Sequence, residues 1–245
     1  MSIRITLATA LRVFTQLRRD HRTMAMLLLV PSLLIVLLNY VFDDSPQVFD
    51  RIGLPLLGVF PFVTMFLVTS VAMLRERTSG TLERLLTTPM AKLDLLIGYG
   101  LAFAVTAALQ AAIASATAYW LLGLDTAGSA WLVVAVAVAD AILGMATGLF
   151  VSAFARNEFQ AVQFLPAVVL PQVLLCGLFA PREAMAGWLQ ALSDVMPLSY
   201  AVEALDEVGL HSEITDTLVR DFGVIIGVAV SVLVLAAATL RRRSA

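Results

Sequence analysis

The sequence has one cysteine, two histidines and few charged side chains among its 245 residues. The lone Cys176 excludes a disulfide framework and a cluster of metal ligands. No phosphate loop of the form GxxxxGK(S/T) is present, so this chain does not bind ATP in the usual way. Only 14% of the residues are charged, 60% are hydrophobic, and the mean hydropathy is +0.92. This composition excludes a soluble globular domain and indicates a polytopic membrane protein with short loops.

Long apolar segments predict the membrane-spanning helices. A helix rises 1.5 Å per residue, so about 20 apolar residues cross the roughly 30 Å of hydrocarbon in a bilayer. The segments long enough to do so are residues 24–42, 54–74, 95–122, 130–154, 159–179 and 218–240. We therefore expect an all-α membrane protein in which residues 1–245 form a single six-span transmembrane domain.

The first 22 residues have a different pattern. Ile3, Leu7 and Leu11 recur at helical spacing with arginines elsewhere, which predicts an amphipathic helix lying in the plane of the membrane interface. A transit peptide is the alternative, but no cleavage signal follows and the next segment is long enough to span the membrane.

A polar segment, residues 75–92, separates the second and third predicted spans. It reads RERTSGTLERLLTTPMAK, with four basic and two acidic residues. Thr78 or Ser79 is a suitable cap for a short helix whose leucines share one face, and Pro89 marks its end. Such a helix, held at the membrane surface by a span on either side, is suited to bind a partner protein and to transmit its movement to the spans. The alternative is a solvated loop that only satisfies the charge rule.

Residues 180–216, before the last span, are too apolar for a solvated loop and too interrupted for a span. Apolar runs of under about 12 residues cannot cross the bilayer, and Pro181 and Pro197 start or break helices. Trp188 and Tyr200 are amphipathic residues suited to the depth of the lipid headgroups. We expect short re-entrant helices that enter the outer leaflet without crossing it.

The 16 basic residues are unequally divided between the two sides of a six-span chain. All but Arg51, Arg182 and Arg220 lie on the side of the N-terminus. The positive-inside rule then predicts a multi-pass protein of the cell membrane whose two termini and 75–92 loop are cytoplasmic. Most acidic residues fall on the outer side, where they would attract cations.

Two segments resemble the ABC-2 family of ABC transporter permeases. The order Arg-Glu-Arg, Gly-Thr, Glu and Thr-Pro within residues 75–89 is similar to the family pattern ReR-x-x-GTlE-x-Ll-x-tP after the second span. The segment LLCGLFAP at 174–181, followed by Trp-Leu at 188–189 and Pro-Leu-Ser-Tyr at 197–200, resembles LfLSGlffP…P-x-wL…nPlsY. Cys176 and the pair Met185-Ala186 depart from that second pattern. The chain is most similar to short drug-export permeases of the daunorubicin-resistance type.

This resemblance implies a non-catalytic permease subunit of an ATP-driven exporter. The 75–92 loop would form the coupling helix seated on a separate ATPase subunit, which carries the ATP and Mg²⁺, and this chain would hold no cofactor. The partners implied are ATPase subunits, a second permease of the same or a related sequence, and membrane lipid, but no nucleic acid. The coupling residues implied are Arg75, Glu76, Arg77, Gly80, Thr81, Glu83, Arg84 and Pro89, and the re-entrant outer segment includes Pro181, Trp188, Pro197 and Tyr200.

The substrate implied by the resemblance is lipophilic, either a drug or a lipid. Polysaccharide exporters of the family line their conduits with aromatic side chains, and in this chain only 8% of the residues are aromatic. The low aromatic content therefore favours a drug or a lipid over a polysaccharide. The resemblance implies that this substrate moves outward across the cytoplasmic membrane.

Asp140 is the one ionisable residue deep in a predicted span. An unpaired carboxylate at that depth costs about 2.5–3.5 kcal/mol on insertion scales, so it should face protein or water. Asp140, Gln163 and Gln172 either line a substrate path or join helices through hydrogen bonds, and Gln110 invites the same two interpretations.

Two other classes of protein are alternatives to the permease. One is an intramembrane enzyme acting on lipid headgroups, with Asp140 or His21 as the acid or base. It is disfavoured because His21 lies in a basic flank and Asp140 has no histidine or second carboxylate in the neighbouring turns. The other is an ion-coupled secondary transporter, which would require an inverted repeat that the sequence does not show convincingly.

Overall fold

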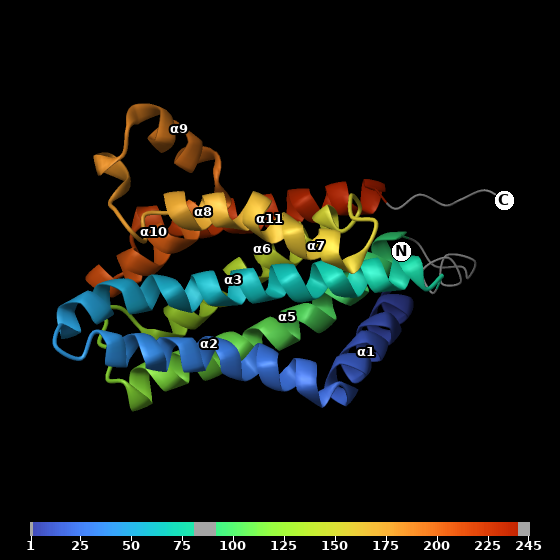
Figure 1. The fold of residues 1–245 in the computed structure, drawn as a ribbon, viewed down its shortest axis with the longest axis horizontal. Coiled ribbons are helices and arrows are strands. Elements are labelled where there is room, and N and C mark those ends of the chain that lie inside the picture. The colour runs from blue at the N-terminus through green and yellow to red at the C-terminus, as the bar shows by residue number, and fades with distance from the viewer. Residues whose placement is uncertain (1, 81–91, 240–245) are drawn as a thin grey trace.

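The computed structural model of the chain describes residues 2–80 and 92–239. Within these residues every regular element is a helix, and six helical segments are long and apolar enough to cross a membrane. They lie side by side as an elongated bundle (Figure 1). The prediction of an all-α protein with six spans is therefore confirmed.

The six segments differ from the predicted ranges mainly at their ends. Their helices are α2 (His21–Val41), α3 (Pro46–Thr78), α5 (Lys92–Ala116), α6 (Ala130–Val151), α7 to α8 (Glu158–Phe164 and Leu170–Leu175) and α11 (Asp216–Thr239). A π-helical turn, Thr117–Leu121, extends α5, and another, Leu165–Val169, joins α7 to α8. The largest difference is at α3, which begins at Pro46, eight residues before the predicted span. Proline is well suited to a first turn because its missing N–H needs no partner there.

The centre of the bundle is the contact between α3 and α6. A Cβ atom added to Gly144 would lie 2.3 Å from the Phe62 carbonyl oxygen, and one added to Gly148 would lie 2.4 Å from the Phe66 carbonyl oxygen. The Thr69 hydroxyl also donates a hydrogen bond to the Met145 carbonyl at 3.2 Å. Glycine thus lets the two backbones approach each other, which compensates for the missing hydrophobic drive between helices in lipid.

Burial separates three central spans from three peripheral ones. In α3, α5 and α6 more than half of the residues in the apolar part of the span are buried. In α2, α7–α8 and α11 the buried share of these residues is 22%, 17% and 22%. The peripheral helices expose large apolar side chains such as Leu29, Val162 and Val230. These faces are suited to contact with lipid or with another membrane protein.

Helix α1 (Ile3–Arg19) slants across one end of the bundle, which we call the α1 end (Figure 1). It packs on the start of α5, where Asp94 accepts hydrogen bonds from the Ser2 amide at 3.0 Å and the Thr6 hydroxyl at 3.2 Å. A Cβ on Gly98 would lie 2.7 Å from Thr9, so α1 and α5 are in close contact. The apolar residues Ile3, Leu7 and Leu11 point outward, as expected of an interfacial helix.

Three short helical elements lie at the opposite end, which we call the α9 end: the 3-10 turn Arg182–Ala184, α9 (Gly187–Val195) and α10 (Pro197–Leu210). Helix α9 projects from the bundle, and α10 packs between α3, α6 and α11 (Figure 1). The loop before α6 is bonded to the end of α10, because Gly128 donates to the Val208 carbonyl at 2.9 Å. The segment from 180 to 216 thus starts and finishes at the same end of the bundle.

Candidate functional site

The last turns of α3 contain the first three residues implied in coupling. Arg75 forms a two-pronged ion pair with Glu158 at the start of α7, with nitrogen–oxygen distances of 2.8 and 3.1 Å. Both side chains are more than half exposed, and an exposed pair of this kind contributes about 0–1 kcal/mol. The pair therefore connects α3 to α7 with little effect on stability.

Glu76 faces the opposite way, toward α1 and α5. Its Oε1 lies 3.6 Å from an Arg12 nitrogen, and Arg12 in turn donates to the Tyr99 hydroxyl at 3.1 Å. The Arg12 guanidinium also lies 5.8 Å from the centre of the Tyr99 ring, which is within the range of a cation–π interaction. The Arg77 side chain is half-buried, and its buried Nε has no hydrogen-bond partner within the described residues. One turn of α3 thus contacts three other helices.

Helix α3 ends at a left-handed glycine. The Ser79 amide donates to the Arg75 carbonyl at 2.9 Å, and Gly80 has a φ of +73°. Glycine adopts this conformation without strain, which is why it is common just after a helix. The other residues implied in coupling, Thr81, Glu83, Arg84 and Pro89, lie outside the described residues, as does most of the predicted coupling helix.

A groove with a cavity volume of about 820 Å³ lies at the α1 end. Its walls come from α1, the first turn of α2, the second half of α3, and α5. About half of the side chains that line the walls are apolar, and the charged groups of Asp20, Arg75 and Glu76 are among the others. The sequence did not suggest this groove, because its walls come from four segments far apart in the chain.

Asp140 lies in the middle of α6 and is completely buried. A Cβ on Gly58 of α3 would lie 3.3 Å from its Oδ2, and the same position would meet Leu205 of α10. Neither carboxyl oxygen has a hydrogen-bond partner in residues 2–80 and 92–239. Asp140 therefore faces protein, at the meeting point of three helices.

The glutamines in the spans differ from one another. Gln110 of α5 donates to the Thr64 hydroxyl of α3 at 2.6 Å and joins two helices. Gln172 donates to the Val168 carbonyl of its own helical segment at 3.0 Å, and Gln163 is exposed on α7. Of these three, Gln110 is the one whose described contacts link separate helices.

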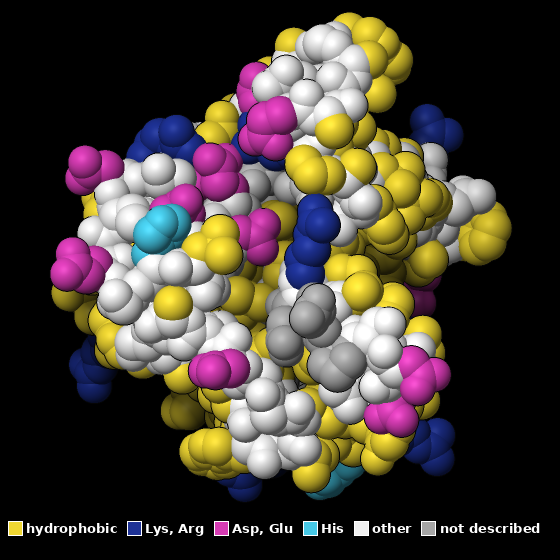
Figure 2. All heavy atoms as spheres, turned by 90° about the vertical axis from the view of Figure 1, so that its left-hand side faces the viewer, with side chains coloured by type: hydrophobic (Ala, Val, Ile, Leu, Met, Phe, Trp, Pro, Cys, Tyr) yellow, Lys and Arg dark blue, Asp and Glu magenta, His cyan; other side chains and the backbone are white. Residues whose placement is uncertain are grey.

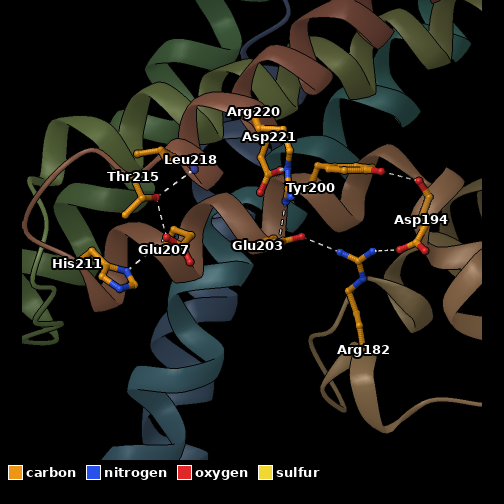
Figure 3. A network of polar contacts seen from close by, with 10 residues as sticks. All are labelled: Arg182, Asp194, Tyr200, Glu203, Glu207, His211, Thr215, Leu218, Arg220 and Asp221. Atoms are coloured by element: carbon orange, nitrogen blue, oxygen red, sulfur yellow. Dashed lines mark hydrogen bonds and ion pairs between the residues drawn. The ribbon is translucent and has the colours of Figure 1, made fainter.

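A network of charged side chains holds the α9 end together (Figure 3). Arg182 donates to Asp194 of α9 and, at 2.7 Å, to Glu203 of α10. Glu203 accepts a second hydrogen bond from Arg220 of α11 at 2.9 Å, and Arg220 also donates to Asp221 at 2.7 Å. The network therefore connects the 3-10 turn, α9, α10 and α11.

The four residues predicted in the outer segment lie around this network. Pro181 precedes the 3-10 turn, Pro197 begins α10, and Trp188 is exposed on α9. The Tyr200 hydroxyl donates to the Asp194 carbonyl at 2.7 Å, and its ring lies under the Arg182 guanidinium. Sequence reasoning missed the network itself, although Arg182 and Arg220 stood out as two of the few basic residues on this side.

Acidic side chains are prominent on the α9 end. Figure 2 looks onto this end and shows Asp and Glu side chains spread over it, with fewer Lys and Arg. A smaller cavity of about 290 Å³ there is lined by Glu203, Asp206 and Glu207 together with Arg51 and Arg182. Burial raises the pKa of the Asp206 carboxyl to about 6, although nearby Arg51 acts in the opposite direction.

Comparison with known proteins identifies the family. The ABC-2 type transporter family model matches residues 6–208, which include most of α1, the first five spans and nearly all of α10. The chain belongs to this family. Relatives of this ABC-2 family member include the probable multidrug ABC transporter permease YbhR of Escherichia coli, which is 28% identical over 66% of this chain and 44% of its own length. The linearmycin resistance permease protein LnrN of Bacillus subtilis is 25% identical over 59% of this chain and 38% of its own.

A third relative of this ABC-2 family member is closer to it in length. The probable doxorubicin resistance ABC transporter permease protein DrrC of Mycobacterium tuberculosis is 25% identical over 82% of this chain and 75% of its own length. The chain spans less than half the length of the Escherichia coli and Bacillus subtilis relatives. The resemblance to drug-export permeases is confirmed by these matches.

Proposed function

We propose that this chain is the permease subunit of an ATP-driven exporter that moves a lipophilic substrate, a drug or a lipid, outward across the cytoplasmic membrane. Separate ATPase subunits would bind ATP and Mg²⁺ and drive the transport. A second permease of the same or a related sequence would complete the path, and this chain would carry out no bond chemistry. The α1 end would be cytoplasmic and the α9 end external.

The observation that carries this proposal is the set of contacts made by the last turns of α3. Arg75 contacts α7, Glu76 contacts Arg12 of α1, and Arg12 contacts Tyr99 of α5. A force applied to the segment after Gly80 would therefore reach three helices within one or two turns of its entry point. This arrangement suits a coupling element through which an ATPase moves a bundle.

The exposed faces of the peripheral spans support a second permease as partner. Helices α2, α7–α8 and α11 present apolar side chains away from the centre of the bundle. The buried Asp140 offers little support to the enzyme alternative, because its carboxyl group makes no hydrogen bond to an acid or base within the described residues.

The test is to purify the full chain with a candidate ATPase taken from a neighbouring reading frame and to reconstitute the complex in lipid. We expect ATP hydrolysis that depends on this chain and is stimulated by lipophilic compounds from a test panel. If the two proteins do not associate, or if hydrolysis is indifferent to the permease, the proposal is wrong.

Orientation can be tested separately in a Cys176→Ser background. We expect Glu213→Cys to react with a thiol reagent that cannot cross membranes when it is added from outside, and Ser79→Cys to react only after the membrane is opened. The reverse pattern would invert the topology.

A further inference from the structure

Helix α1 presents a line of exposed apolar side chains away from the bundle. Its buried residues lie on the side that packs on α5, and they are Thr6, Thr9 and Val13. On the outward side, exposed apolar residues follow one another at four-residue steps, at Ile3, Leu7 and Leu11. A helix that exposes such a line beside a membrane domain is suited to lie at the bilayer interface.

A basic line runs directly beside the apolar one on α1. It consists of Arg4, Ala8, Arg12, Thr15 and Arg19. Arg4 and Arg19 are exposed, and their side chains form no hydrogen bond or ion pair within residues 2–80 and 92–239. Arg12, in contrast, is engaged by other helices of the bundle. The two ends of the basic line can therefore bind an anion, and its middle attaches the line to the protein.

The charge around α1 also favours an anion. Residues 2–22 contain five arginines and one acidic residue, Asp20. Two further carboxylates contact α1 from neighbouring helices, those of Glu76 and Asp94. The five positive charges exceed these three negative ones, so this surface attracts negatively charged groups.

A hollow of about 490 Å³ lies on the basic line. Its lining residues are Ala8, Leu11, Arg12, Thr15, Gln16 and Arg19. Arg19 and the side-chain amide of Gln16 are exposed N–H donors, and Leu11 adds an apolar edge. All the lining residues belong to α1, so the hollow covers a ligand on one side only. A soluble anion would remain largely in water there, whereas a lipid headgroup is covered on its other sides by neighbouring lipids.

We propose that this hollow binds an anionic phospholipid, with the phosphate at Arg19 and Gln16 and the acyl chains beside Leu11. The guanidinium group suits this role because it can donate two parallel hydrogen bonds to a phosphate. Arg4 lies about 22 Å further along the helix, at 1.5 Å per residue, and would meet a second headgroup of the same leaflet. The lipid is a partner of α1 and not the transported substrate, so the proposal goes beyond the export function.

Lipid binding to the purified full chain in a neutral detergent tests the proposal. Native mass spectrometry measures the affinity of the first bound lipid, for dioctanoyl phosphatidylglycerol and for dioctanoyl phosphatidylcholine, which has the same acyl chains. We expect the anionic lipid to bind about fivefold more tightly, as one arginine near an anionic headgroup would produce. Equal affinities would overturn the proposal. Glycerol 3-phosphate supplies a soluble phosphate, and binding as tight as that of phosphatidylglycerol would also contradict a lipid site.

Variants of single exposed arginines locate the preference on α1. Arg19→Gln should lower the preference for phosphatidylglycerol to about twofold, and the double variant Arg4→Gln/Arg19→Gln should abolish it. The matched control is Arg156→Gln, which removes an exposed arginine from the turn between α6 and α7 and should leave the preference at about fivefold. If Arg156→Gln lowers the preference as much as Arg19→Gln does, the general charge of this end attracts the lipid and the α1 site is wrong.

A variant of the apolar line separates the contribution of the acyl chains from that of the charge. Leu7→Asn exchanges an exposed side chain and should weaken the binding of both lipids equally. Their affinity ratio should stay within about twofold of the parental value. A variant that loses the preference for the anionic lipid and keeps the affinity for phosphatidylcholine would contradict this division of roles.

The ATPase is absent from these measurements, so their result does not depend on the export function. An acidic surface of a partner protein is the other occupant that a basic line could bind. If Arg4→Gln/Arg19→Gln weakens the association with the candidate ATPase while the preference for phosphatidylglycerol stays at about fivefold, the line is a protein interface and the lipid proposal is wrong.

Discussion

At the α9 end, one continuous network of charged side chains connects four elements. At the α1 end, separate pairs of charged side chains connect the helices. Arg182 has only 17% of its side chain exposed and bonds two carboxylates on different helices. Arg75 is 64% exposed and bonds one. The described cavities at the α9 end are also smaller, at about 370 and 290 Å³ against 820 Å³.

This difference indicates which end can change shape. The exposed Arg75–Glu158 ion pair is weak and exchanges easily with water, so the contact of α3 with α7 can be broken and remade at little cost. In the network at the α9 end Arg182, Glu203 and Arg220 each have two partners, so several contacts are lost when one element moves. The α1 end is therefore suited to motion, and the α9 end is suited to holding the short helices in place.

The largest effect on transport is expected from substitutions in the segment that follows α3, through which an ATPase would move the α1 end. Glu83→Lys, or Gly80→Val, should abolish ATP-linked transport while leaving the protein inserted and folded. Valine at Gly80 would be strained by the positive φ, and Glu83 lies in the stretch that resembles the coupling helix. Transport into inside-out vesicles measures this, with Glu213→Lys at the α9 end as the control. If both variants export at the parental rate, the segment after α3 does not couple this chain to the ATPase.

A smaller effect on stability should distinguish the two ends directly. Arg182→Met should lower the Tm of the purified protein by about 5 °C, because it leaves Asp194 and Glu203 without their shared cation. Arg75→Met should lower it by less than about 2 °C, since the lost pair is exposed. Tryptophan fluorescence during heating gives both values. Equal losses would mean that the two ends are held with similar strength.

Asp140, between the two ends, should tolerate one substitution and not another. Asp140→Asn keeps a similar volume and should retain transport, whereas Asp140→Leu forces a larger branched side chain against Gly58 and Leu205 and should reduce the amount of folded protein. Size-exclusion profiles and transport rates measured from pH 6 to 8 test this. A pH dependence that is present in the parent and lost in Asp140→Asn would indicate proton coupling.

The smallest effect concerns Asp206 at the α9 end. Burial raises the pKa of its carboxyl group to about 6 in the folded protein, so the folded state binds its proton more tightly than the unfolded state does. Stability should then fall as the pH rises from about 4 through 6. Asp206→Asn should raise the Tm by about 1–2 °C at pH 7.5 and leave it unchanged at pH 4. A gain of the same size at both pH values would contradict a titrating Asp206 carboxyl as the cause.

Hydropathy and proline positions were sufficient to predict the number of spans and the presence of short helices between the last two. These features depend on length and local chemistry, which can be read directly from the chain. The extension of α3 back to Pro46 was missed because the predicted span was limited to the apolar residues 54–74, whereas a proline in the first turn is compatible with a helix.

The details of the candidate site were less accessible. Arg12 and Glu76 are far apart in sequence, and their contact depends on how α1 and α3 rotate about their axes, which composition does not specify. The groove could not be predicted for the same reason, because its walls come from several segments that are far apart in the sequence. Asp140 was recognised as unusual, but whether a partner lay opposite it depended on the packing of α3 and α10. Pairing between helices is thus the part that required the structure.

The close contact of α3 with α6 also constrains the order in which the protein can assemble. These helices are the second and fourth spans to leave the ribosome, and residues 79–129 are made between them. Gly144 and Gly148 cannot meet Phe62 and Phe66 until the fourth span has entered the membrane. The first three spans must therefore wait in lipid without the centre of the bundle, and an arrest of synthesis before residue 144 should leave them accessible to membrane quality-control proteases.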